Sequence, residues 1–235
     1  MRFTFINRLA LIPLLCVVAA LEAQTTIHHT LVAQPGTWSV APGVTATGWF
    51  YNGQLPGPLL RGTVGDTLRV QFINRTPEPT SVHFHGLPVP LGQDGVPMIS
   101  RPAVEPGQEY TYTLPLTRPG TYFYHSHFGH QLDRGLHGLL IVDPATSSDA
   151  AYDRELIVDL DDLLPGDPIH GQDPIYADYL MNGKNSAGQT PWVVDQGDVL
   201  RIRFINSSSF TTYVVTLDGH LLEVSHADGR KVQPV

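Results

Sequence analysis

The stretch Gly-Asp-Thr-Leu-Arg-Val-Gln-Phe-Ile-Asn at residues 65–74 decides the fold, because it returns almost unchanged later in the chain. Residues 197–206 read Gly-Asp-Val-Leu-Arg-Ile-Arg-Phe-Ile-Asn, so seven of the ten positions are identical. In both copies apolar residues alternate with polar ones, the two-residue period of a strand with one buried face. Asn52-Gly53 precedes the first copy, and Asn182-Gly183 precedes the second. This repeat predicts two copies of one β-domain.

The surrounding sequence favours strands as well. Apolar and polar residues alternate from Tyr110 to Leu116, and an aromatic run from Tyr122 to His127 follows the turn signal Pro119-Gly120. The chain has 22 Gly and 20 Pro, which suit short strands joined by turns. No long segment shows a helical period, so we expect an all-β fold built from β-sandwiches.

The domain limits follow from the repeat. We expect a first domain at residues 24–145, a linker rich in Ala, Ser, Thr and Asp at 144–151, and a second domain at 152–235. The first copy continues about seventy residues beyond its repeat, whereas the second has twenty-nine residues after Asn206. The second sandwich is therefore expected to be incomplete, and the chain to be an N-terminal fragment.

Residues 1–23 have the pattern of a signal peptide. Arg2 and Arg8 flank the start of an apolar run, Leu9 to Ala20, that is short for a membrane span, and cleavage is expected after Ala20 or Ala23. We expect an exported protein, periplasmic or extracellular, without a membrane anchor once the signal is removed. The only cysteine, Cys16, lies inside this run, so the mature chain would have neither a disulfide nor a thiolate metal ligand.

Charge excludes some partners. The net charge is −8 and Lys and Arg do not cluster, which argues against nucleic acid and anionic membranes as partners.

Two His-x-His pairs, His83/His85 and His125/His127, are the chemically informative motifs. Residues i and i+2 of a strand point to the same face, so each pair places two imidazoles roughly 7 Å apart at the backbone. Imidazole suits copper and zinc, and copper binds most tightly among divalent first-row metals. Two such pairs in one cysteine-free β-domain predict a metal centre.

Other classes of enzyme also use this motif. Amidohydrolase barrels open with His-x-His but need alternating helices, which the sequence lacks. Cupins need a glutamate a few residues after the pair, and none follows His85 in that position. A mononuclear zinc or copper enzyme, and a non-catalytic exported copper-binding protein, remain as alternatives.

Several motifs together resemble the first cupredoxin domain of multicopper oxidases of the laccase-like and copper-resistance types. They lie across residues 36–143 and are Asn52–Pro58, Gly65-Asp66, His83–Leu87, Asp94–Pro97, Gly120–His127 and Gly138–Asp143. Residues 180–235, with Asp218-Gly219-His220, are similar to the family's second cupredoxin domain. The resemblance implies two plastocyanin-like Greek-key β-sandwiches and an enzyme that couples one-electron oxidation of a small substrate, a phenol or metal ion, to reduction of O2 to water.

The resemblance also implies residue roles. His83 would bind a type 2 copper, and His85, His125 and His127 a type 3 pair. Asp94 would supply protons or orient water as the catalytic acid, although Asp94-Gly95 is equally typical of a plain turn. The family's type 1 copper needs a cysteine, and its cluster needs further His-x-His pairs from a third domain, which we expect to be missing. The repeat places Val215 and Leu217 where the first copy has His83 and His85, so the second domain is not expected to bind metal.

Overall fold

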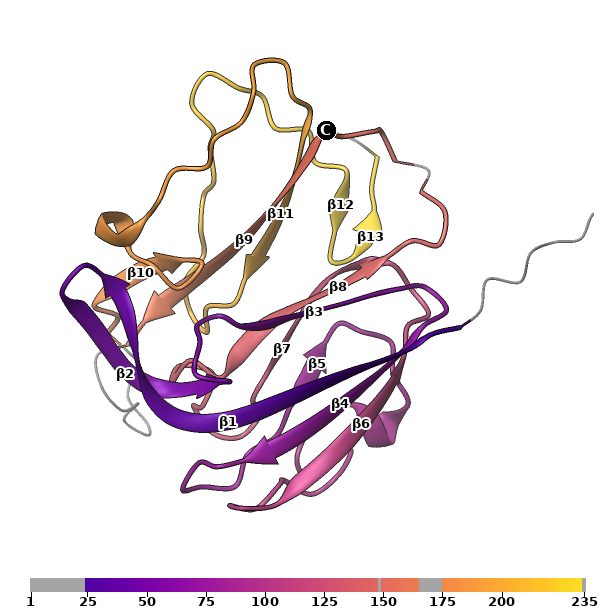
Figure 1. Cartoon of the computed structure of the whole chain (residues 1–235), viewed down its shortest axis with the longest axis vertical. Helices are drawn as coiled ribbons and strands as arrows, with labels where there is room; N and C mark the ends of the chain where they lie inside the picture. The colour runs from indigo at the N-terminus through magenta and orange to yellow at the C-terminus, as the bar shows by residue number, and fades with distance from the viewer. Residues whose placement is uncertain (1–23, 148, 165–174, 234–235) are drawn as a thin grey trace, which may run out of the picture.

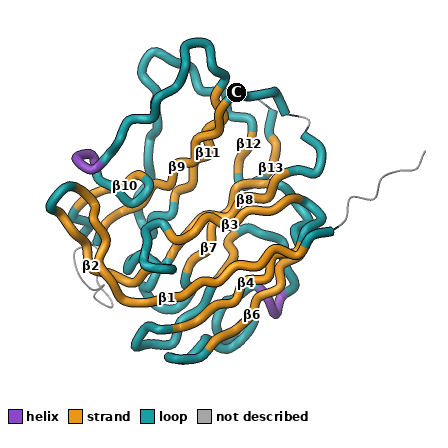
Figure 2. The backbone as a smooth tube through the Cα atoms, in the orientation of Figure 1, coloured by secondary structure: helices purple, strands orange, loops and turns teal. Residues whose placement is uncertain are grey.

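The structure, a computed structural model, describes residues 24–147, 149–164 and 175–233, so the predicted signal peptide lies outside the described residues. These residues form strands joined by loops, with two three-residue 3-10 helices, which confirms the all-β prediction (Figures 1 and 2). The elements are β1 Thr26–Ala41, β2 Val44–Tyr51, β3 Gly57–Thr63, β4 Thr67–Asn74, β5 His83–His85, η1 Leu91–Gln93, β6 Glu109–Pro115, β7 Gly120–His125, β8 His137–Asp143, β9 Arg154–Leu163, β10 Asp178–Met181, η2 Ser186–Gly188, β11 Leu200–Asn206, β12 His226–Ala227 and β13 Arg230–Lys231. We call β1–β8 the first unit and β9–β13 the second unit.

The first unit is a sandwich of two four-stranded sheets. One sheet has the order β2-β1-β4-β6 and the other β3-β8-β7-β5, and each contains one parallel pair, β1 with β4 and β3 with β8. Alternate residues of both sheets meet between them, and Phe72, Phe84 and Tyr112 are fully buried there. The sandwich therefore has the continuous apolar core that the alternating pattern predicts.

The two copies of the repeat adopt the same local structure. β11 runs parallel to β9 as β4 runs parallel to β1, and β10 pairs antiparallel with β9 as β2 does with β1. The turns before the copies match as well: φ is 55° and 71° at Asn52-Gly53, and 51° and 72° at Asn182-Gly183. Both turns need the left-handed conformation that Asn and Gly tolerate best. The sequence repeat is thus a repeat of backbone structure.

Burial of the two copies differs, although the same alternating pattern occurs in both. Phe72 in β4 is 0% exposed, whereas its counterpart Phe204 in β11 is 42% exposed. β4 lies between β1 and β6 and faces the second sheet of its sandwich, while β11 pairs with β9 on one side among the described residues. The alternating pattern fixes which residues share a face, but the elements packed against that face decide whether it is buried.

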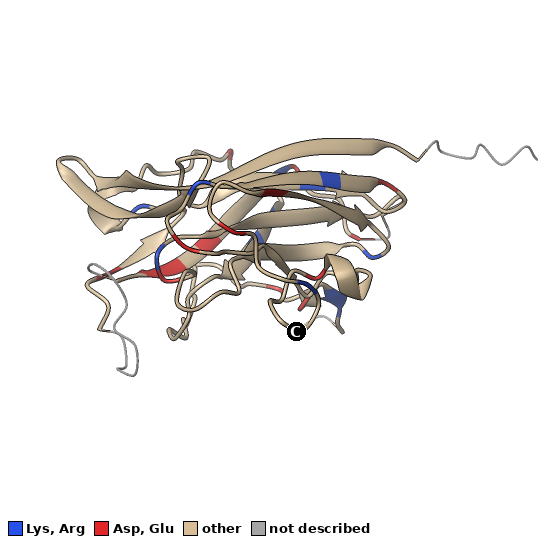
Figure 3. Cartoon of the chain, turned by 90° about the horizontal axis from the view of Figure 1, so that it is seen from below, with Lys and Arg blue, Asp and Glu red and all other residues tan. Residues whose placement is uncertain are grey.

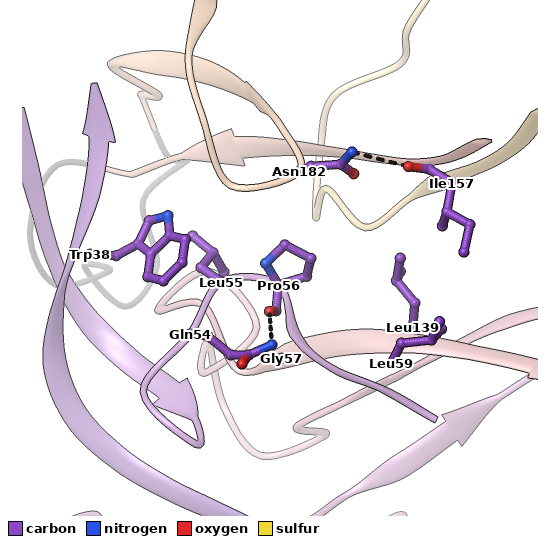
Figure 4. A pocket seen from close by; sticks show the side chains of 9 residues that line it. All are labelled: Trp38, Gln54, Leu55, Pro56, Gly57, Leu59, Leu139, Ile157 and Asn182. Carbon is purple, nitrogen blue, oxygen red and sulfur yellow. Dashed lines mark hydrogen bonds between the residues drawn. The ribbon is translucent and has the colours of Figure 1, made fainter. Parts of the chain in front are cut away.

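The two units pack against each other along β8 and β9. Val40, Phe50 and Leu55 of the first unit form a buried cluster with Leu180 of the second. Beside this cluster lies a cavity of about 400 Å³, lined from both sides by residues that include Trp38, Leu139 and Ile157 (Figure 4).

Ion pairs extend the junction between the units. Arg61 of β3 forms ion pairs with Asp143 of β8 and with Glu155 of β9. Glu155 also forms an ion pair with Arg203 of β11. Arg203 in turn donates a hydrogen bond to Thr121 Oγ1 of β7, in the first unit. The units thus share a polar as well as an apolar boundary. Elsewhere in the described part of the chain, acidic and basic positions are interspersed along the ribbon (Figure 3). No helix in the described ranges has the length and apolar character needed to cross a bilayer.

Candidate metal centre

Strand pairing brings the two His-x-His pairs together. β5 and β7 pair antiparallel with His83 opposite His125 and His85 opposite Phe123. Opposite residues of an antiparallel pair project from the same face, and Phe84 and Tyr124, which alternate with these residues, point into the core. The imidazoles of the β5–β7 pair therefore project from the outer face of their sheet. The two His-x-His pairs are about forty residues apart in sequence, yet their four candidate ligands meet at one place, as the sequence predicts.

The ring nitrogens converge closely. His83, His85 and His125 each offer one nitrogen, and these three atoms lie within 4.8 Å of one another. The His85 Nδ1 and His125 Nε2 atoms are 3.4 Å apart. The His127 ring centroid lies 5.3 Å from that of His83 and 5.9 Å from that of His125. A single metal or two adjacent metals could be held by this set.

Backbone carbonyls fix two of these rings from behind. His83 Nδ1 lies 2.8 Å from the carbonyl oxygen of Asp94, and His125 Nδ1 lies 2.8 Å from that of Ser126. If each Nδ1–H donates to its carbonyl, each Nε2 keeps its lone pair for a metal. Metal-binding histidines are usually oriented by hydrogen bonds of this kind.

His127 differs from the prediction in its local structure. β7 ends at His125, so His127 lies just beyond the strand, and it is exposed. Its position comes from a side-chain contact instead, because its backbone N–H donates to Ser81 Oγ at 3.0 Å. The strand period therefore explains the pair His83/His85 but only part of the pair His125/His127.

Asp94 lies in a turn beside His83, and its role in proton supply or water orientation stays a prediction. It ends η1, and Gly95 follows with φ at 81° in close contact with Val82. The Asp94 carbonyl oxygen contacts His83 Nδ1, as described above, and the Asp94 carboxylate Oδ1 lies 3.4 Å from the same nitrogen. Asp94 is thus a turn residue whose backbone and side chain both face one candidate ligand.

Electrostatics favour neutral imidazoles in this cluster. Burial, with smaller contributions from the neighbouring His83, His85 and His127, lowers the pKa of His125 to about 3, although the contact with the Ser126 carbonyl acts in the opposite direction. Burial also lowers the pKa of His85, with contributions from His83 and His127 in the same direction. Neutral imidazole is the form that binds metal, so these two side chains are ready to bind at neutral pH.

Sequence reasoning missed the polar side chains that brace the cluster. Ser126, between the two histidines, is buried; its hydroxyl donates to Gln131 Oε1 at 2.7 Å and lies 3.1 Å from Thr80 Oγ1. A serine between two outward-facing strand positions points to the core side, where a polar group needs a partner. That rule could have indicated a bracing role for Ser126, but not the identity of Gln131 or Thr80.

Space is available next to the cluster. A hollow of about 630 Å³ is bordered by His127, Phe128, Gly129 and the loop 97–103. Met98 and Ile99 in this loop are 98% and 74% exposed. The candidate centre therefore lies beside an open, partly apolar surface.

A β-sandwich with four histidines gathered at the outer face of one sheet is typical of β-proteins that have an imidazole-rich metal centre. Within that class, residues 32–147 and residues 159–235 each match a family model described as multicopper oxidase. The chain belongs to the multicopper oxidase family, whose metal is copper.

Individual relatives support the same assignment. The chain is 34% identical to the multicopper oxidase MmcO of Mycobacterium tuberculosis, over 89% of this chain and 48% of that protein. It is 32% identical to copper resistance protein A of Escherichia coli, over 78% of this chain and 39% of that protein. Among solved structures it is similar to a multi-copper oxidase from Pseudomonas thermotolerans, with a TM-score of 0.81 and 30% identity over 91% of this chain and 54% of the other. The chain thus spans about half or less of the length of these curated relatives.

Proposed function

We propose that this chain supplies four imidazole ligands, His83, His85, His125 and His127, to a copper centre of an oxidoreductase that reduces O2 to water. The observation that carries the proposal is the convergence of three ring nitrogens within 4.8 Å, two of whose rings are fixed from behind by carbonyl oxygens. Bound copper would supply one-electron transfer from a small reducing substrate, a phenol or a metal ion, to dioxygen. Imidazole nitrogens without thiolate or carboxylate ligands fit copper well.

The individual roles follow the family resemblance. We assign His83 to a type 2 copper and His85, His125 and His127 to a type 3 pair. Asp94 would orient His83 through its carbonyl, and its carboxylate would supply protons or orient water beside that ring. A type 1 site needs a thiolate, and the only cysteine is Cys16 in the predicted signal peptide.

Ligand number implies a partner. Three coppers that shared four imidazoles would be coordinated mainly by water and held weakly, because cluster geometry depends on ligands fixed by protein. The remaining histidines would come from a third cupredoxin domain, for which the open surface at His127 and loop 97–103 leaves room. By the same family resemblance the protein would be exported to the periplasm or outside the cell.

Copper titration tests the proposal. The purified chain is titrated with Cu(II) in a calorimeter, in parallel with four single variants that replace His83, His85, His125 or His127 by Ala. Each variant should bind copper at least about tenfold more weakly, because each substitution removes one of the four proposed imidazole ligands. His220→Ala is the matched control, since His220 is exposed and belongs to the second unit. Unchanged binding in all four variants would refute the site.

The alternative, an exported protein that binds copper without catalysis, makes the same titration prediction. It differs in oxygen chemistry, because a non-catalytic protein would take up no oxygen with a reducing substrate.

A further inference from the structure

A buried ion pair stands behind the candidate copper centre at the junction of the two units. His137 of β8 and Asp159 of β9 are both 0% exposed, and His137 Nε2 lies 3.0 Å from Asp159 Oδ2. Asp161 Oδ2 lies 3.9 Å from the same nitrogen. The copper site as proposed above makes no use of this pair.

His137 is the residue of β8 that lies directly opposite His125. The β7–β8 ladder pairs His125 with His137, as the β5–β7 ladder pairs His83 with His125. The three histidines thus form one row across three neighbouring strands, on the outer face of the sheet. In this row His83 and His125 belong to the candidate centre, and His137 lies under the second unit.

The histidine is anchored from one side, by the second unit. Its other ring nitrogen, Nδ1, is buried and has no hydrogen-bond partner among the residues that the structure describes. Asp159 is itself held firmly: Ser207 Oγ donates to Asp159 Oδ1 at 2.5 Å, and the Asn182 side chain accepts from the Asp159 N–H and donates to the Ile157 carbonyl (Figure 4). The position of the His137 ring is therefore set by β9, β11 and the Asn182 turn.

Stability alone does not account for such a pair. Buried ion pairs contribute little net stability, because the cost of desolvating two charges offsets their attraction, and apolar residues of similar size often serve as well. A buried polar contact more often serves to fix one arrangement of the elements that it joins. Here the elements joined are the strand beside His125 and the first strand of the second unit.

We infer that His137 is a positioning residue for the candidate copper centre, through which Asp159 of the second unit fixes the place of His125. The anchor acts through the backbone: Asp159 holds His137, and the β7–β8 ladder carries that constraint to His125. The second unit, whose described residues hold no group of converging metal ligands, thereby sets the geometry of the proposed metal site in the first. This inference rests on the proposed copper site.

The test measures copper binding and the copper spectrum, in the full chain at pH 7. His137→Gln and Asp159→Asn should each weaken Cu(II) binding, by up to about tenfold, the lower end of the range for residues that orient ligands. Each should also change the nitrogen hyperfine pattern in the electron paramagnetic resonance spectrum of the chain with one equivalent of Cu(II). The double variant should be no weaker than either single variant, because the two residues act as one unit.

Two further variants keep the test decisive. Arg203→Gln removes other contacts between the units, the ion pair with Asp143 of β8 and the hydrogen bond to Thr121, which lies four residues along β7 from His125. This variant should leave the copper affinity and the spectrum unchanged. Ser207→Ala loosens Asp159 without removing a charge, so it gives the answer if the charge variants fail to fold, and it should show a smaller effect of the same kind.

The outcomes separate the two proposals. If His83→Ala loses copper while His137→Gln and Ser207→Ala match the original chain, the positioning role is wrong and the copper site stands. The same holds if Arg203→Gln weakens binding as much as His137→Gln, since that would show a general loosening of the junction. If His83→Ala binds copper normally, the proposed site itself fails.

Discussion

At the scale of single residues, the structure shows how one glycine supports the position of His83, a candidate metal ligand. Gly95 has φ at 81°, and a Cβ at this position would lie 1.7 Å from the carbonyl oxygen of Val82, the residue before His83. Gly95→Ala should therefore lower the free energy of unfolding by roughly 2–4 kcal/mol and weaken copper binding, since the start of β5 must move. Denaturant unfolding and copper titration measure both effects.

Gly107→Ala is the matched control for this substitution. Gly107 has φ at 77°, so alanine meets the same backbone strain, but no atom lies within 4 Å of the added Cβ. We expect a loss of about 1–2 kcal/mol and unchanged copper affinity. Equal behaviour of the two variants would show that contact with Val82 does not position His83.

Cysteine content leads to a second prediction at this scale. An intense blue colour in copper proteins comes from a thiolate ligand, and Cys16 is the only cysteine. The chain without residues 1–23, loaded with Cu(II), should show only weak visible absorption and a spectrum typical of nitrogen ligands. A strong thiolate-type band would contradict the assignment of the ligands to histidines alone.

At the scale of elements, the junction of β8 and β9 should make stability depend on pH. Burial opposes a charge on His137, but the carboxylates of Asp161 and Asp159 outweigh it and raise the pKa of His137 to about 9. Between the ordinary histidine pKa of about 6.5 and 9, the folded chain binds a proton that the unfolded chain has released. The stability is thus fully present below about pH 6.5 and is lost as pH rises through 9.

We expect the free energy of unfolding of the metal-free chain to fall by up to about 3 kcal/mol over this window, from a shift in pKa of this size. Denaturant unfolding at several pH values between 6 and 10 measures the slope, and His137→Gln should flatten it. A slope that is the same in both proteins would mean that His137 is not charged in the folded chain.

At the scale of the whole molecule, four imidazoles and no thiolate should not sustain catalysis. The chain alone should not take up oxygen with a phenolic donor, because electrons enter this family's enzymes at a thiolate site and the cluster needs further ligands. If the proposed function is right, adding a separately produced third cupredoxin domain of the family should allow copper-dependent uptake, provided that this domain docks beside loop 97–103. An oxygen electrode measures both cases, with His83→Ala as the control.

The possible results distinguish three functions. Turnover by the 235-residue chain alone, abolished by His83→Ala, would indicate a self-sufficient enzyme. Uptake only with the added domain would support the shared cluster. No uptake in either case would favour the non-catalytic copper-binding protein.

The sequence alone determined the features that depend on a few neighbouring residues. The strand period of residues 65–74 and 197–206 is local, so it predicted β4 and β11. The recurrence of Asn-Gly before each copy indicated that the two copies share local structure, and the two turns found there match. The spacing of His83 and His85 predicted two imidazoles on one face, because successive strand residues alternate between faces. Asp94-Gly95 indicated a turn, but not that the Asp94 carbonyl contacts His83.

Only the tertiary structure decided the features that depend on distant segments. The pairing of β5 with β7 placed His83 opposite His125. Packing left Phe204 exposed although its counterpart Phe72 is buried. The position of β9 brought Asp159 into contact with His137. The physical reason is that a local pattern states which residues share a face, while the choice of partner strand, its register and the covering element result from packing of the whole chain. The candidate ligands could therefore be named from sequence, but the residues that hold them in place could not.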